Sequence, residues 1–262
     1  MSRALRVLAT LAFVSQFWPE SSGSDLAPSY SSAGIVNSAS NQAPLSPNAI
    51  ASLYGTNLAY DTASVTQSDI GSGALPTVLA GVAVYVAGMP ASLYYVSPLQ
   101  INFLIPANLR PGDVVVFVAR QGTRGPFATV TLLTASPGLY QVDGETIVAT
   151  HSDGSRVTTA ASASGGEVVL FYCTGLGPTN PDVISGQISQ TLAPIQMLAD
   201  LRVTVGTATL GAQQIFYAGV APGVPGLYLI QAQLPDTMPA DPAVQIALGA
   251  QISPPALKMA AQ

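Results

Sequence analysis

The sequence predicts an all-β fold made of two β-sandwiches in tandem. Its 262 residues include 24 glycines and 21 prolines, which interrupt the chain too often for long helices. Short apolar runs recur between these turn residues, as strands do in sheet proteins. The order of the runs in the first half also returns in the second half, which indicates a repeated unit.

Residues 1–27 have the layout of a signal peptide and leader. Arg3 and Arg6 precede an apolar run at 7–14, and a small polar stretch follows at 21–24. A basic start, a short apolar core and small residues at a cleavage site are typical of secretory signals. We therefore expect a secreted or cell-surface protein. An uncleaved anchor is the alternative, but the run is short against about 30 Å of hydrocarbon.

The strands are predicted from periodicity and from their boundaries. Val82, Val84 and Val86 alternate with Ala83 and Tyr85, which places the valines on one face of a sheet. Apolar runs bounded by turn residues predict further strands in the first half at 49–54, 93–96, 101–105, 114–119 and 128–133. The second half has such runs at 146–150, 168–172, 201–205, 214–218, 227–234 and 244–248.

An internal repeat relates the two halves. The blocks that match in the same order are 50–58 with 168–176, 79–86 with 198–205, Tyr95 with Tyr217, 101–106 with 230–235, and 114–118 with 244–248. A unit of about 100 residues is the size of an immunoglobulin-like sandwich. We therefore predict two tandem immunoglobulin-like β-sandwich units, over 33–134 and 135–257.

Several segments carry a family resemblance. The motifs are IVNSAS at 35–40, LYGTNLA at 53–59, LYYVSPLQIN at 93–102, ASPGLY at 135–140, TGLG at 174–177 and YAGVAPG at 217–223. Together they resemble a C-terminal domain family of unknown function found in secreted proteins of Solibacter and other acidobacteria. The GTNL and GLG turns are also similar to those of immunoglobulin-like IPT/TIG domains. The family has no established activity, so the resemblance implies no catalytic residues.

Residue types that carry catalysis are scarce. His151 is the single histidine and Cys173 the single cysteine, so neither a multi-histidine zinc site nor a disulfide framework can form. The stretch 151–154 has the composition of a hairpin turn. Cys173 follows an apolar run, and we expect it to be a buried small residue. No metal, no cofactor and no enzymatic activity are expected.

Composition and the aromatic residues point to binding. Charged residues make up 8% of the chain and the net charge is −5, so nucleic acid is not an expected partner. We expect a non-catalytic module for adhesion, scaffolding or interaction with an unknown protein or envelope polymer. Tyr94 and Tyr95 are the candidate binding residues. They are adjacent in a predicted strand, so one ring should pack in the core and the other should face outward.

Two other functions stay open. A hydrolase would need two carboxylates about 5 to 9.5 Å apart, held by loops between the two units. The acids, however, fall mostly in predicted turns, where aspartate bonds the local backbone. A carbohydrate-binding module would need at least two coplanar exposed tyrosines on one sheet, drawn from Tyr54, Tyr94, Tyr95 and Tyr217.

Overall fold

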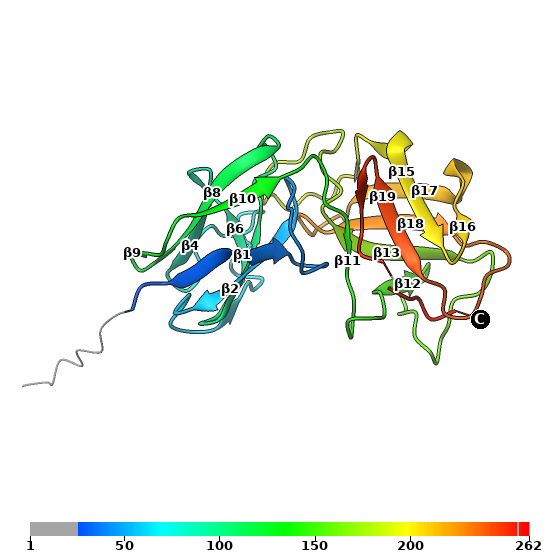
Figure 1. Cartoon of the computed structure of the whole chain (residues 1–262), viewed down its shortest axis with the longest axis horizontal. Coiled ribbons are helices and arrows are strands. Elements are labelled where there is room, and N and C mark those ends of the chain that lie inside the picture. The colour runs from blue at the N-terminus through cyan, green and yellow to red at the C-terminus, as the bar shows by residue number, and fades with distance from the viewer. Residues whose placement is uncertain (1–25, 256, 262) are drawn as a thin grey trace, which may run out of the picture.

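The computed structural model describes residues 26–255 and 257–261 and confirms the all-β class. Antiparallel pairing joins the strands into four sheets, two in each half of the chain (Figure 1). Two single-turn 3-10 helices, η1 (Leu198–Asp200) and η2 (Ala212–Gln214), accompany them. No helix among the described residues has the length and apolarity to cross a bilayer. The predicted signal peptide falls on residues 1–25, outside the described part, and on the two residues that follow.

Two sheets make up the first half. Its strands are β1 (Ser29–Asn37), β2 (Ile50–Thr56), β3 (Ala63–Ser64), β4 (Val82–Val86), β5 (Met89–Pro90), β6 (Ser92–Val96), β7 (Gln100–Leu104), β8 (Gly112–Arg120), β9 (Thr123–Arg124) and β10 (Ala128–Leu132). One sheet has the order β1-β2-β7-β6-β3. The other has the order β10-β8-β4-β5, with β9 beside β8.

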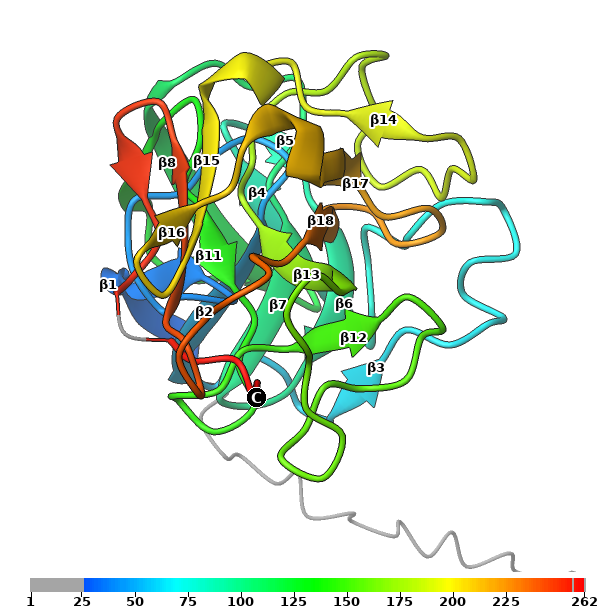
Figure 2. The ribbon, with the colours of Figure 1, turned by 90° about the vertical axis from the view of Figure 1, so that its right-hand side faces the viewer.

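Two further sheets make up the second half, which comes to the front in Figure 2. Its strands are β11 (Gly138–Leu139), β12 (Ala149–His151), β13 (Val168–Thr174), β14 (Ala193–Pro194), β15 (Leu201–Val205), β16 (Ala208–Thr209), β17 (Ile215–Val220), β18 (Tyr228–Gln233), β19 (Val244–Leu248) and β20 (Gln251–Ile252). One sheet has the order β11-β13-β18-β17-β14, with β12 beside β13. The other has the order β16-β15-β19-β20.

Each half has its own hydrophobic core. The first core draws on residues 35–132 and includes Val82, Val84 and Val86, which are fully buried, so the valine alternation is confirmed. The second core draws on residues 135–261. The two clusters share no residue, as two separate sandwiches require. The exact bounds of the two units, and their origin as a repeat, stay predictions.

Buried polar side chains join the halves along a seam. Asn48 Nδ2 donates to the Tyr228 hydroxyl at 3.0 Å. The Thr174 hydroxyl accepts from the Ile50 N–H at 2.9 Å and donates to the Gly226 carbonyl at 2.7 Å. Buried polar groups are costly without partners, so these bonds hold the two halves in one arrangement.

Candidate binding surfaces

The predicted tyrosines lie on β6, where the sheet is irregular. The pairing of β6 with β7 shifts register between Leu93 and Tyr95. Leu93 and Val96 belong to the core, whereas neither Tyr94 nor Tyr95 does. A β-bulge places two residues of one strand opposite one residue of its partner and interrupts the alternation of side chains. The expectation that one of the two rings packs in the core is therefore wrong.

Tyr94 is engaged within the protein. Its hydroxyl donates to the carbonyl of Pro225, which lies across the seam in the second half. Burial raises the pKa of the Tyr94 phenol above its ordinary value. Tyr94 thus contributes to the seam, and its hydroxyl group is not available to a ligand. Tyr95 is half-buried and lies opposite Asn102 in the β6–β7 pairing.

A tyrosine–amide face, made of Tyr54, Tyr95, Gln100 and Asn102, covers the outer side of the first sheet. Tyr54 is 42% exposed and lies opposite Gln100. The Asn102 side-chain oxygen accepts from the Ser52 hydroxyl at 2.9 Å and from Gln100 Nε2 at 2.8 Å. These two bonds orient the Asn102 amide, and no described residue accepts from its Nδ2. A ligand can therefore meet an oriented amide donor between two tyrosines.

An aromatic–arginine surface, made of Tyr85, Phe117, Arg124 and Phe127, covers the outer side of the second sheet. Tyr85 and Phe117 are cross-strand partners whose rings stack with centroids 4.7 Å apart and planes 11° apart. Phe127 meets Phe117 edge to face at 5.4 Å. The Arg124 guanidinium lies 4.6 Å from the Phe127 ring centroid, within the range of a cation–π contact.

Strand alternation shows that the aromatic–arginine surface faces away from the core. Val116 and Val118 of β8 are fully buried, so Phe117 between them faces away from the core. Phe127, which immediately precedes β10, is 60% exposed. The sequence reasoning missed this surface because Tyr85, Phe117 and Phe127 are far apart in the chain. Alternation could have shown that Tyr85 faces outward, but cross-strand register decides which ring lies beside it.

The ring geometry limits what this surface can bind. The Tyr85 and Phe117 rings face each other, so they are nearly parallel but do not lie side by side as an open platform. Arg124 lies over the Phe127 ring. A flat sugar needs an open ring face, whereas the side chains of a protein partner pack against ring edges as well. The described rings therefore do not form an open, side-by-side stacking platform.

The hairpin predicted at His151 is present. The His151 N–H donates to the Ser155 carbonyl at 2.9 Å, and the Gly154 N–H donates to the His151 carbonyl at 3.0 Å. His151 Nδ1 lies 2.5 Å from Glu167 Oε1, and its Nε2 lies 3.1 Å from the Ala161 carbonyl. The hydrogen bond to Glu167 raises the pKa of His151. Both ring nitrogens face acceptors, an arrangement that suits a protonated, structural imidazole.

Three of the predicted turn acids bond their own turns. The carboxylates of Asp69, Asp143 and Asp153 accept from nearby backbone N–H groups and side-chain hydroxyls, which lower the pKa of each. Cys173 is fully buried, as expected, and burial raises the pKa of its thiol. In residues 26–255 and 257–261, no group of three or more metal-ligating side chains comes together.

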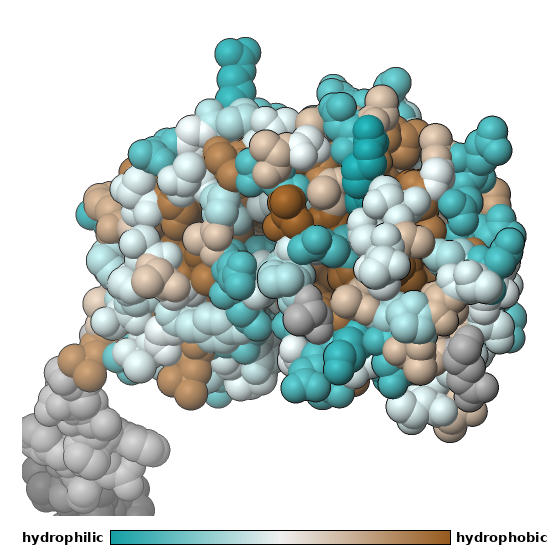
Figure 3. Space-filling view, turned by 45° about the vertical axis from the view of Figure 1, so that its right-hand side comes forward, coloured by the Kyte–Doolittle hydropathy of each residue, from teal (hydrophilic) through white to brown (hydrophobic). Residues whose placement is uncertain are grey.

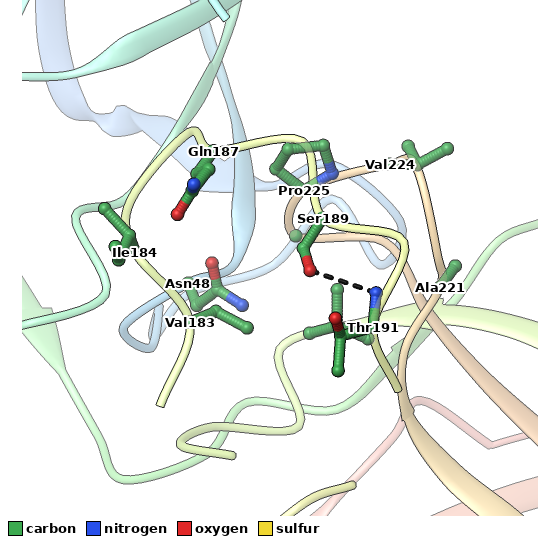
Figure 4. Close-up of a pocket in the computed structure, with 11 residues that line it drawn as sticks. Asn48, Val183, Ile184, Gln187, Ser189, Thr191, Ala221, Val224 and Pro225 are labelled. Atoms are coloured by element: carbon green, nitrogen blue, oxygen red, sulfur yellow. Dashed lines mark hydrogen bonds between the residues drawn. The ribbon is translucent and has the colours of Figure 1, made fainter. Parts of the chain in front are cut away.

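A small cavity lies at the seam (Figure 4). Its volume is about 10 Å³, roughly the space that one water molecule needs. Asn48 and the segment 183–191 line it, and the Thr191 N–H donates to Ser189 Oγ at 3.1 Å within that lining. No acid is among its lining residues. This cavity therefore offers no site to the hydrolase alternative.

Comparison with known proteins identifies no family. No family model and no curated protein matches the chain. Among solved structures, the SGBP-B protein of the Bacteroides ovatus mixed-linkage glucan utilization locus aligns with a TM-score of 0.31 and 13% identity. That alignment covers 83% of this chain and 43% of that one.

Two other solved structures align in the same way. The surface glycan-binding protein PbSGBP-B of Prevotella bryantii gives a TM-score of 0.25 and 15% identity, over 88% of this chain and 43% of that one. Domains 5–6 of the S-layer protein SbsC give a TM-score of 0.28 and 9% identity, over 89% of this chain and 98% of that one. The chain spans less than half the length of the two glycan-binding proteins. No residue role follows from likeness at this level.

Proposed function

We propose that the chain is a non-catalytic binding module that holds a protein partner outside the cell through its aromatic–arginine surface. The observation that carries this proposal is the cluster of three aromatic rings and one arginine on the outer face of a sheet. Export, which residues 1–27 predict, is part of the proposal. Asp69, Asp143 and Asp153 bond the backbone of their own turns, and Cys173 is buried. Both observations support a role without catalysis.

The energetics favour a contact at Phe127. Full burial of an exposed phenylalanine side chain is worth about 1.5–3 kcal/mol, and Phe127, which is 60% exposed, would gain part of this when a partner covers it. Aromatic residues and arginine are enriched at interfaces, and tryptophan, tyrosine and arginine are enriched among the few residues that carry most binding energy. Arg124 forms no ion pair with any residue that the structure describes, so its N–H groups are available to a carboxylate or carbonyl. The expected partner thus offers an apolar side chain beside an acceptor.

Affinity capture with paired variants tests the proposal. The purified chain is immobilised and challenged with secreted and envelope proteins of the producing cells. Phe127→Ala removes the most exposed ring, and Ile184→Ala is the matched control, because Ile184 is 70% exposed and lies in a different part of the chain. A protein retained by the native chain and by Ile184→Ala, but lost with Phe127→Ala, supports the site. Equal retention by all three would place the contact elsewhere.

Carbohydrate binding is a second candidate function, favoured by the tyrosine–amide face. Tyr54 and Tyr95 flank the amides of Gln100 and Asn102, and the Asn102 Nδ2 has no acceptor among the described residues. Affinity electrophoresis in gels that contain neutral polysaccharides tests it. Retardation of the native chain that Tyr54→Ala abolishes, and Phe127→Ala does not, would support this reading. Unchanged mobility in every gel would refute it.

A further inference from the structure

A groove of about 750 Å³ opens at one edge of the second sandwich. We name it the edge groove; its principal lining residues are Leu198, Leu201, Arg202, Leu210, Ala212 and Ile215. It lies between β15 and β17, which belong to different sheets and face the viewer in Figure 2. Figure 3 shows apolar side chains recessed between polar ones on the half that comes forward.

Side chains of the second core line the bottom of the edge groove. Leu201 and Leu210 are buried members of the second core, and Ile215 packs against it. Leu198, on the rim, is 45% exposed. The apolar surface that the groove exposes therefore comes mainly from Leu198 and partly buried Ile215, above buried core side chains. A ligand of matching shape would gain by removing this surface from water.

One wall of the groove has no counterpart in the first half. The Ala91 N–H donates to the Val84 carbonyl at 2.8 Å, and the Leu210 N–H donates to the Val203 carbonyl at 2.8 Å. The hairpins that end at Ala91 and at Leu210 therefore close with the same hydrogen bond. The first half then enters β6 at once. The second half inserts η2 before β17 begins. A bond from the Gly211 N–H to Gln214 Oε1 at 2.9 Å stabilises this turn.

A cation lies in the apolar lining. Arg202 Nη1 donates to the carbonyls of Ala199 and Leu201, each at 2.8 Å, which fixes the guanidinium at the groove. Arg202 makes no ion pair with a residue in the described part of the chain, not even with nearby Asp200. The guanidinium has five N–H donors, so those on Nε and Nη2 stay available to an anion.

We propose that the edge groove binds a small amphiphilic monocarboxylate, such as a medium-chain fatty acid. Its apolar body would lie against Leu198 and Ile215, and its carboxylate would pair with Arg202. Ligand sites of this size are mostly apolar with a few placed polar groups. Arginine matches the two oxygens of a carboxylate with two parallel hydrogen bonds. This site is independent of the aromatic–arginine surface and of its partner.

Calorimetric titration of the purified chain with decanoate tests the proposal. Saturable binding at one site is expected. Arg202→Gln should weaken it by about tenfold, the effect of losing one charge-assisted contact. Ala212→Trp should abolish it, because Ala212 is exposed and a large ring there fills the groove without disturbing the core. Arg156→Gln, which removes an exposed cation elsewhere, is the control and should change nothing.

Decanol separates the charge from the apolar body. It has the same chain length without the carboxylate. The native protein should therefore bind decanol about tenfold more weakly than decanoate. The affinity for decanol should be the same in the native protein and in Arg202→Gln. Thermal melting of each variant shows whether it stays folded. Absence of saturable binding, equal affinity of the native chain and Arg202→Gln for decanoate, or undiminished binding by Ala212→Trp would each overturn the proposal.

Discussion

Thr174→Val should destabilise the protein by several kcal/mol although valine has nearly the shape of threonine. Thr174 is fully buried, and its hydroxyl bonds the Ile50 N–H at 2.9 Å and the Gly226 carbonyl at 2.7 Å. Valine can make neither bond, so one buried donor and one buried acceptor lose their partner. Each such group costs about 1–3 kcal/mol, which gives about 2–6 kcal/mol for the pair.

Such a loss is a large part of the about 5–15 kcal/mol that stabilises a typical native protein. Urea denaturation, followed by circular dichroism, measures it as a fall in the free energy of unfolding. Ile50 belongs to the first half and Thr174 to the second, so the loss of the Ile50–Thr174 bond also weakens the seam. We expect the native chain to unfold in one transition and the variant to show two, because the two halves are then less tightly joined.

Two further variants make this reasoning refutable. Thr174→Ser keeps the hydroxyl and loses one methyl group, so it should cost only about 1 kcal/mol. Thr129→Val is the surface control, because Thr129 is exposed on β10, and it should change stability by less than about 0.5 kcal/mol. If Thr174→Val proves as stable as Thr174→Ser, the two hydrogen bonds of the Thr174 hydroxyl do not stabilise the fold or the seam.

Three other outcomes follow from the same structure. Glu167 raises the pKa of His151, so the pair should stabilise the fold fully below the unfolded pKa of about 6.5 and lose this effect as the pH rises through the raised folded pKa. The difference in unfolding free energy between the native chain and His151→Gln should therefore shrink from pH 5 to 9, and a constant difference would contradict this. The Cys173 thiol should resist iodoacetamide in the native protein and react after unfolding in urea, and prompt native alkylation would contradict its burial. Phe103→Ala should cost about 3–5 kcal/mol, because Phe103 is fully buried, whereas Phe127→Ala should cost far less; equal thermal shifts would contradict this contrast.

Features that depend on neighbouring residues could be predicted from the sequence. The frequent glycines and prolines and the short apolar runs indicated an all-β chain, because local backbone preferences exclude long helices. Alternation at 82–86 identified the buried valines, since side chains of a strand point to opposite faces in turn. The hairpin at His151 and the buried Cys173 followed from the same local rules.

Contacts between residues far apart in the chain could not be predicted and became visible in the folded chain. The bulge on β6 kept both Tyr94 and Tyr95 out of the core, and the partner of Tyr94, Pro225, comes from the other half of the chain. The stacking of Tyr85 on Phe117 depends on the register between β4 and β8, and the edge groove depends on where the η2 insertion comes to lie. Register and packing are set by the burial of whole sheet faces, so no local pattern specifies them.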